Sequence, residues 1–143
     1  MPDFRRVTDD FYVAPQIEES DVGAAVAAGF RTLVNNRPDG EQPGQMPCSV
    51  SEQAAHAVAL AFYPIPVAGE PTLDAVAAMQ VVLKDAPRPI LAYCRSGTRS
   101  VKLWAMASVR SGAVSPEAAI DAARGAGYDL GPMAAALRSL QSA

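Results

Sequence analysis

Residues 88–107 read RPILAYCRSGTRSVKLWAMA, and this stretch passes from a strand pattern through a short loop into a helix pattern. The apolar run PILAY is typical of a buried strand, and SVKLWAMASV has helical periodicity. Between them, Cys94 is followed by a glycine, two arginines and several hydroxyl residues. A loop that joins the end of a strand to the start of a helix can present backbone N–H groups to an anion. The stretch therefore predicts an α/β fold with an anion-binding loop after Cys94.

The segments before this loop also alternate between strand and helix patterns. Two β-prone pieces, FRRV and FYVA, predict a hairpin around TDD. A helix is predicted within EESDVGAAVAAGF, with Ser20 or Asp21 as its cap and Gly29 after its end. The apolar and β-branched segment RTLVNN then predicts a buried strand.

A long Pro- and Gly-rich loop, RPDGEQPGQMPCS, interrupts the alternation, and long ordered loops are commonly functional. Ser49 and Glu52 fit a capping box for the helix SEQAAHAVALAF, and the prolines of YPIPV favour an edge strand. Thr72 is the predicted cap of the helix LDAVAAMQVVLKD. A later helix is predicted with Ser115 as its cap, Pro116 at its first position and Gly125 past its end, and a last short helix around PMAAALRSL.

The pattern as a whole predicts an α/β fold with a mostly parallel central sheet of four to five strands, flanked by helices. At 143 residues we expect one domain, spanning residues 1–143. Ligands of such sheets bind beyond the carboxyl ends of the strands. The loops at 36–50, 67–72 and 94–99 are therefore expected on one rim.

Composition excludes several classes of function. Half of the residues are apolar and 19% are charged, as in a folded globular protein, and 12 basic against 15 acidic residues give a net charge of −3. A nucleic-acid or membrane-surface protein needs a concentrated basic patch instead. The opening MPDFRRVTDD lacks the apolar core of a signal peptide, so a cytoplasmic location is expected, with Cys48 and Cys94 as free thiols.

The loop contains what a reactive thiolate needs. A free cysteine is mostly protonated at pH 7, and backbone donors, a helix N-terminus and a nearby cation all favour the thiolate. Gly97 allows a tight turn, Arg99 can offer a fork to an oxyanion, and Ser100 or Thr98 can donate to the sulfur. We expect Cys94 and Arg99 to be catalytic. The predicted substrate-binding and anion-binding residues are Arg95, Ser96, Gly97, Thr98 and Ser100.

The motif YCRSGTRS resembles both the active loop of rhodanese sulfurtransferases and the phosphate-binding loop of cysteine-dependent phosphatases. With VAPQI, GFRTLVNNRPDGE and YPIPV before it, the chain resembles the bacterial phosphatase-like domain that occurs alone or fused to beta-lactamase-like hydrolases and persulfide dioxygenases. The resemblance covers roughly residues 4–110. It implies a dual-specificity-phosphatase-like fold and a family described both as phosphatase-like and as sulfur transferase.

Two departures from the phosphatase pattern favour sulfur over phosphorus. Four residues separate Cys94 from Arg99, as in rhodaneses, whereas cysteine phosphatases have five, and a shorter loop makes a smaller cradle. Those phosphatases protonate the leaving group with an Asp on the loop that here reads VAGEPT, which holds only Glu70. The predicted function is transfer of sulfane sulfur from thiosulfate or a small persulfide, such as that of glutathione, through a Cys94 persulfide.

Two alternatives stay open: a cysteine phosphatase acting on a phosphoester with Cys94 and Arg99, and an anion-binding module without catalysis. The resemblance also implies a functional link to a persulfide dioxygenase or beta-lactamase-like hydrolase. Neither a cofactor nor a metal is expected, because one histidine and two cysteines make no convincing zinc site.

Further residues near the predicted rim have weaker claims to a role. Cys48 is a possible resolving thiol, and Arg37, Asp39 and Glu70 are possible rim residues or acids. The sequence PDG is also typical of an ordinary turn, which gives Asp39 a structural alternative. Trp104 follows the loop on the predicted helix, where we expect it in the core.

Overall fold

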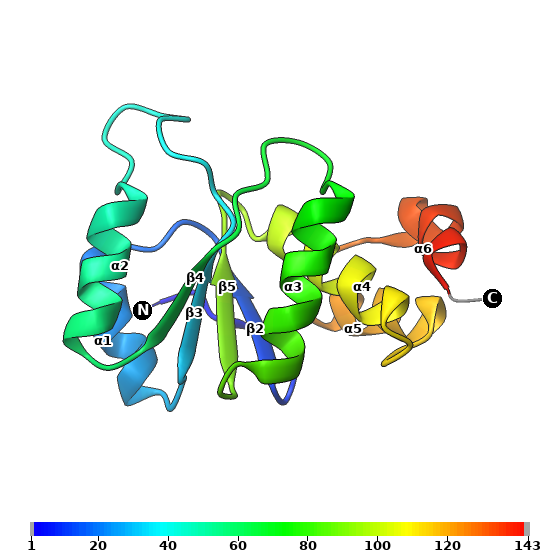
Figure 1. The fold of residues 1–143 in the computed structure, drawn as a ribbon, viewed down its shortest axis with the longest axis horizontal. Coiled ribbons are helices and arrows are strands. Elements are labelled where there is room, and N and C mark those ends of the chain that lie inside the picture. Colours follow the sequence, from blue (N-terminus) through cyan, green and yellow to red (C-terminus); the bar gives the residue numbers. More distant parts are fainter. Residues whose placement is uncertain (1, 142–143) are drawn as a thin grey trace.

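The computed structural model describes residues 2–141 and contains a mixed α/β fold (Figure 1). The strands are β1 (Arg5–Thr8), β2 (Phe11–Ala14), β3 (Thr32–Asn35), β4 (Ala61–Pro64) and β5 (Ile90–Tyr93). The helices are α1 (Glu19–Ala27), α2 (Cys48–Ala57), α3 (Leu73–Asp85), α4 (Thr98–Arg110), α5 (Pro116–Gly125) and α6 (Ala134–Leu140), with a 3₁₀ turn at Gly131–Met133.

The sheet has five strands in the order β1-β2-β5-β3-β4. β1 and β2 form the predicted antiparallel hairpin, while the β2–β5, β5–β3 and β3–β4 pairs are parallel. The prediction of a mostly parallel sheet of four to five strands is therefore confirmed. β5 lies in the middle of the sheet with all four residues buried, which explains why its sequence is apolar throughout rather than alternating.

Helices cover both faces of the sheet: α1 and α2 lie on one side, and α3, α4, α5 and α6 on the other (Figure 1). Adjacent residues of a strand point to opposite faces, so β5 contributes to two cores. Leu91 and Tyr93 belong to the cluster under α1 and α2, whereas Ile90 and Ala92 belong to the larger cluster on the other face. Trp104 of α4 lies in that larger core, stacked on Phe11 with ring centroids 5.8 Å apart, as expected.

Two predicted helix starts were wrong. Glu18 caps α1, and Asp21 completes a capping box from the third helical position by accepting from the Glu18 N–H at 2.8 Å. α2 begins at Cys48 after Pro47, so the predicted Ser49–Glu52 box lies inside the helix. The cap of α2 comes instead from a distant carboxylate, because Asp39 accepts from the Cys48 N–H at 2.8 Å.

Other boundaries agree more closely with the sequence pattern. Thr72 caps α3 by accepting from the Ala75 N–H at 3.2 Å, over the predicted helix. α2 ends and β4 begins earlier than predicted, although β4 is the expected edge strand. Gly125 is the last residue of α5 rather than the residue after it.

The strands and helices of the structure are all short. Within residues 2–141, every helix is too short, or insufficiently apolar, to cross a bilayer.

Candidate functional site

The loop after β5 is held at the carboxyl edge of the sheet. Cys94 directly follows the central strand, and α4 begins four residues later, at Thr98. Gly97 precedes α4 with a φ of 91°, a conformation that glycine adopts without a Cβ clash. The chain after β2 supports the loop from one side, because the Gln16 N–H donates to the Arg95 carbonyl at 3.1 Å. The strand-to-helix junction predicted from the sequence is thus present.

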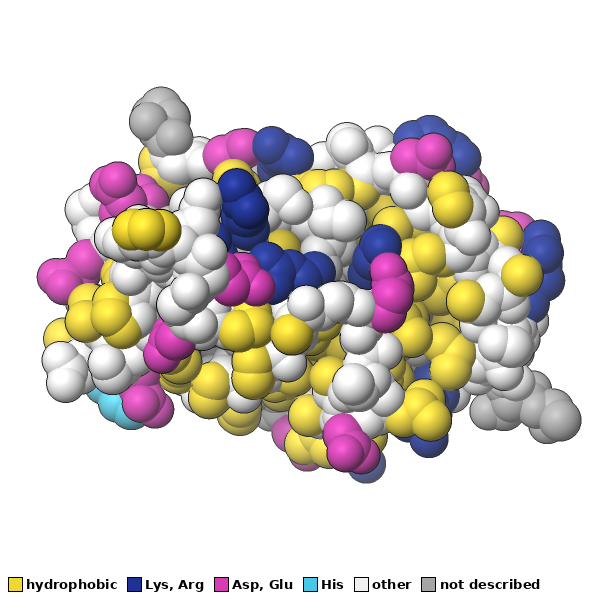
Figure 2. All heavy atoms as spheres, turned by 90° about the horizontal axis from the view of Figure 1, so that it is seen from above, with side chains coloured by type: hydrophobic (Ala, Val, Ile, Leu, Met, Phe, Trp, Pro, Cys, Tyr) yellow, Lys and Arg dark blue, Asp and Glu magenta, His cyan; other side chains and the backbone are white. Residues whose placement is uncertain are grey.

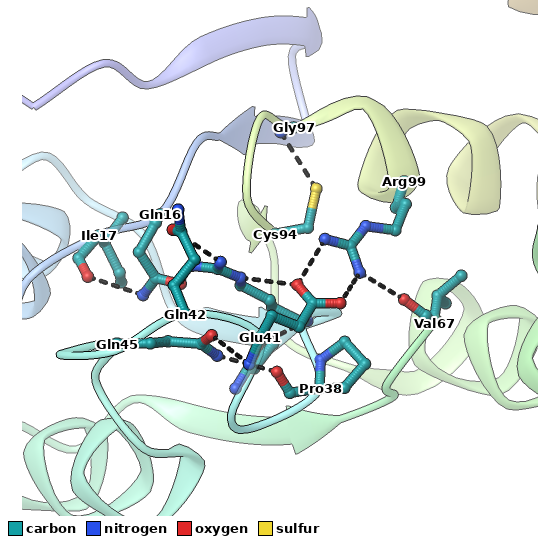
Figure 3. A network of polar contacts seen from close by, with 12 residues as sticks. Gln16, Ile17, Pro38, Glu41, Gln42, Gln45, Val67, Cys94, Gly97 and Arg99 are labelled. Carbon is teal, nitrogen blue, oxygen red and sulfur yellow. Dashed lines mark hydrogen bonds and ion pairs between the residues drawn. The ribbon is translucent and has the colours of Figure 1, made fainter. Parts of the chain in front are cut away.

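The Cys94 side chain points into this loop (Figure 3). Its sulfur is fully buried and accepts a hydrogen bond from the Gly97 N–H at 3.1 Å. The N-terminal end of α4 therefore presents a backbone donor directly to the sulfur.

The hydroxyl donors expected from the sequence do not contact the sulfur. Thr98 Oγ1 accepts from Ser96 Oγ at 3.0 Å, and Ser100 Oγ is buried without a hydrogen-bond partner among the described residues. A backbone group, the Gly97 N–H, donates to the Cys94 sulfur in place of these hydroxyls.

Arg99 joins three segments that are far apart in the sequence (Figure 3). Its two terminal nitrogens donate to the two carboxylate oxygens of Glu41, each at 2.8 Å. One of them also donates to the Val67 carbonyl at 2.7 Å. The ion pair with Glu41 raises the pKa of Arg99, and the nearby Cys94 sulfur contributes to that rise. The three loops predicted to share a rim do meet, at this guanidinium.

Glu41 is a residue of the site that the sequence did not suggest. Glu41 accepts hydrogen bonds from Arg99 and also from Arg37 Nε at 2.8 Å. These bonds lower the pKa of Glu41 from 4.5 to about 2, and the bond to Arg99 has the larger effect. Arg37 is nearly inaccessible, with 2% of its side chain exposed, and it donates further to Gln16 and Gln42. A glutamate in a Pro- and Gly-rich loop carries no pattern that could have identified it, because its partners come from distant segments.

The other two carboxylates predicted near the rim are engaged elsewhere. Asp39 binds the first N–H of α2, as described above. Glu70 pairs with Lys102 Nζ at 3.1 Å and has 75% of its side chain exposed. Among the described residues, neither carboxylate has a hydrogen bond or ion pair with Cys94 or Arg99.

Cys48, the predicted resolving thiol, is half-buried at the start of α2. Burial raises the pKa of its thiol, and the negative charges of Asp39 and Glu52 act in the same direction. A raised pKa leaves less thiolate at neutral pH, which weakens the case for a resolving role. Across residues 2–141, histidine, cysteine and acidic side chains form no group of three that could hold a metal ion.

Figure 2 looks down on this rim, where basic and acidic side chains lie together near the centre of the face. Arg95 and Ser96 are exposed at the loop. A cavity of about 640 Å³ lies beside them, lined by Arg95, Arg37, the chain after β2 and the 42–46 segment. Its size is typical of a site for a small ligand.

Tyr128, between α5 and α6, is a second residue of the site that the sequence did not suggest. Its hydroxyl donates to the Ser96 carbonyl at 2.9 Å and accepts from Arg5 Nη1 at 3.0 Å. Tyr128 therefore contacts the loop around Cys94, and Arg5 of β1 contacts Tyr128 in turn.

This fold and this cysteine loop agree with a match over residues 3–113 to the family "Beta-lactamase hydrolase-like protein, phosphatase-like domain". The chain belongs to this family. The chain is 31% identical over 126 residues to the beta-lactamase hydrolase-like protein of Agrobacterium fabrum. That match covers 87% of the chain but only 29% of the relative, so the chain spans less than a third of the relative's length.

Solved structures agree on the architecture. A candidate phosphatase from Neisseria meningitidis is 26% identical, with a TM-score of 0.84 over 99% of this chain and 100% of that one. Kinase associated phosphatase, solved with its catalytic-site cysteine replaced by serine, has a TM-score of 0.71 at 17% identity over 98% of this chain and 91% of that one. The chain thus has the cysteine-phosphatase fold, as the resemblance of its motifs implied.

Proposed function

We propose that the phosphatase-like domain is a sulfurtransferase that carries sulfane sulfur on Cys94. The observation that carries this proposal is the loop itself, in which four residues separate Cys94 from Arg99. A loop of this length encloses less space than the five-residue spacing of cysteine phosphatases. The small cradle suits one additional sulfur atom on Cys94 better than a tetrahedral phosphoryl group.

The proposed reaction has two steps. The Cys94 thiolate attacks the outer sulfur of thiosulfate, a sulfur–sulfur bond forms, and sulfite leaves with the electron pair of the broken bond. The thiolate of an acceptor then takes the outer sulfur, and the electron pair of the second broken bond returns to Cys94 Sγ. Loop N–H groups and Arg99 stabilise the anionic donor and the persulfide.

The carboxylates near the site support sulfur transfer, because this chemistry needs less protonation of the leaving group than phosphate-ester cleavage does. Cleavage of a phosphate ester depends on a general acid that is protonated near neutral pH. Glu41 is ionised there, since its pKa is about 2. Asp39 and Glu70 are bound to the α2 backbone and to Lys102.

In this proposal the sulfur of the donor lies in the cradle, and the rest of the donor extends past Arg95 toward the cavity of about 640 Å³ that Arg95 lines. The volume is larger than thiosulfate needs and accommodates an organic persulfide such as that of glutathione. A functional link to a hydrolase-like partner is part of the proposal, because the Agrobacterium fabrum relative is described as beta-lactamase hydrolase-like.

The second candidate function is a cysteine phosphatase. The comparisons with known proteins favour it over sulfur transfer, because the family that matches and the similar solved structures are phosphatase-like. In that reaction Cys94 would attack phosphorus and Arg99 would bind the phosphoryl oxygens. The third, an anion-binding module without catalysis, would keep the cradle and lose the chemistry.

One pair of assays separates these functions: thiocyanate formation from thiosulfate and cyanide, and hydrolysis of p-nitrophenyl phosphate. We expect thiocyanate formation by the wild type, its loss in Cys94→Ser, and a mass gain of about 32 Da on Cys94 after incubation with donor. Phosphate release that depends on Cys94, without sulfur transfer, would establish the phosphatase instead. Absence of both activities with sulfate still bound would establish the binding module.

Arg99→Lys tests the role of the guanidinium in the same assays. A lysine cannot donate to two oxygens in a fixed fork, so we expect the rate to fall by roughly ten- to a hundredfold. Arg110→Lys is the matched control, because Arg110 lies at the far end of α4 and donates to Gln80. Equal rates for the two variants would remove Arg99 from the proposed mechanism.

A further inference from the structure

We propose that Tyr128, held by Arg5, is a positioning residue that locks the peptide unit between Ser96 and Gly97, so that its N–H faces the Cys94 sulfur. Tyr128 lies outside residues 3–113, the part of the chain that matches the family. The inference deepens the proposed function, since it concerns the same nucleophile. Its tests need neither a sulfur donor nor a phosphoester.

The Ser96 carbonyl and the Gly97 N–H belong to one planar trans amide, in which the two groups point in opposite directions. The Tyr128 hydroxyl donates to that carbonyl at 2.9 Å. The N–H on the other side of the amide donates to Cys94 Sγ at 3.1 Å. Fixing the carbonyl at Tyr128 therefore also fixes the donor at the sulfur.

This peptide unit needs an external restraint because of Gly97. With a φ of 91° and no Cβ, Gly97 can change backbone conformation more freely than other residues. A rotation of the 96–97 amide would replace the N–H with a carbonyl oxygen beside the sulfur. That oxygen would repel a thiolate, whereas the N–H stabilises it.

Arg5 directs the Tyr128 hydroxyl. Arg5 Nη1 donates to the phenol oxygen at 3.0 Å, so the single proton of the hydroxyl is left for the Ser96 carbonyl. The Arg5 guanidinium also lies 5.2 Å from the ring centroid, and Asp3 holds it with three hydrogen bonds. The hydroxyl stays protonated at neutral pH, because burial raises the pKa of Tyr128 further above its ordinary value.

Packing leaves little space for another arrangement. Tyr128 is 8% exposed, and a Cβ built on Gly97 would lie 2.1 Å from its hydroxyl oxygen. The hydroxyl therefore rests directly against the glycine whose N–H contacts the sulfur.

The test is Tyr128→Phe, which removes the hydroxyl and keeps the ring. We expect iodoacetamide to alkylate Cys94 about fivefold more slowly at pH 7, which corresponds to one hydrogen bond of typical strength. The rate is followed on the Cys94 peptide by mass spectrometry. We also expect the Gly97 amide hydrogen to exchange several-fold faster, measured by NMR, with amides of α3 unchanged.

Tyr12→Phe is the matched control, because the Tyr12 hydroxyl has no hydrogen bond among the described residues, and both measurements should equal those of the wild type. Arg5→Met is the second variant and should change both measurements in the same direction as Tyr128→Phe. It keeps the inference testable if Tyr128→Phe does not fold. Wild-type values for the Arg5 variant, or for a folded Tyr128→Phe, would overturn the inference. Failure of this inference can be distinguished from failure of the proposed function, because the sulfur-transfer and phosphate assays report the function separately.

Discussion

At the scale of single residues, the site consists of a buried sulfur and a chain of charges beside it. Arg37, Glu41 and Arg99 form a continuous ion-pair network at the rim, and Arg99 also approaches Cys94. Glu41 occupies the fork of Arg99 in the structure, so the anionic substrate of the proposed function would have to share or displace this contact. The sequence indicated both arginines but not the carboxylate between them.

The ionised Glu41 should make stability depend on pH. The pKa of Glu41 is about 2 in the folded chain, below its ordinary value of 4.5. The contribution of its ion pairs to the free energy of unfolding is therefore complete above about pH 5 and is lost as the pH falls toward 2. Glu41→Gln removes this dependence. We expect the difference in urea midpoint between wild type and Glu41→Gln to be larger at pH 6 than at pH 3.

Gln42→Ala is the control for this measurement. Gln42 also contacts Arg37 but carries no charge, so its effect on the urea midpoint should be the same at both pH values. A difference for Glu41→Gln that does not shrink at pH 3 would contradict the assigned role of its ion pairs.

At the scale of elements, the central strand and the following helix place the site. β5 has neighbours on both sides, β2 and β3, and its four residues are buried, so Cys94 leaves the sheet from a rigid position. α4 packs against α3, α5 and α6, which fixes the direction in which its N-terminus points. Helix caps set the start of each helix, and the sequence predicted some caps correctly and others not.

Ser115→Ala tests a predicted cap that the structure contains. The Ser115 side chain accepts from the Ala118 N–H at 3.1 Å at the start of α5, and losing such a cap costs about 1 kcal/mol. Ser49→Ala is the comparison, because Ser49 lies inside α2 and makes no capping bond. We expect urea unfolding to show a cost of less than about 0.5 kcal/mol for Ser49→Ala; a reversed order would contradict the caps described here.

At the scale of the whole molecule, the segment after residue 113 completes the larger core. α5 and α6 pack on α4, Leu137 of α6 is fully buried, and the turn between these helices supplies Tyr128. This segment lies beyond the match to the family, yet it contacts the loop at the other end of α4. Through Tyr128 the loop is also linked to Arg5 of β1, near the other end of the chain.

Leu137→Ala tests whether this segment belongs to the cooperative core. Truncating a fully buried leucine costs about 2 to 5 kcal/mol, so we expect a clear loss of unfolding free energy in a urea titration. Leu73→Ala is the matched control, because Leu73 is 60% exposed on α3 and its loss should cost less than about 0.5 kcal/mol. A small effect of Leu137→Ala would show that α6 contributes little to stability.

The sequence alone determined the class of fold, the Cys94 loop and the cap of α3, because strand runs, helix periodicity and capping are local patterns. The sequence also predicted that three loops lie at one rim, since the carboxyl ends of parallel strands lie along one edge of a sheet. Tertiary structure decided the rest. Glu41 meets Arg99 across 58 positions, Asp39 caps α2 from nine residues before it, and Tyr128 reaches the loop from 32 residues beyond Ser96. These contacts depend on how the elements pack, and no local pattern of residues specifies them.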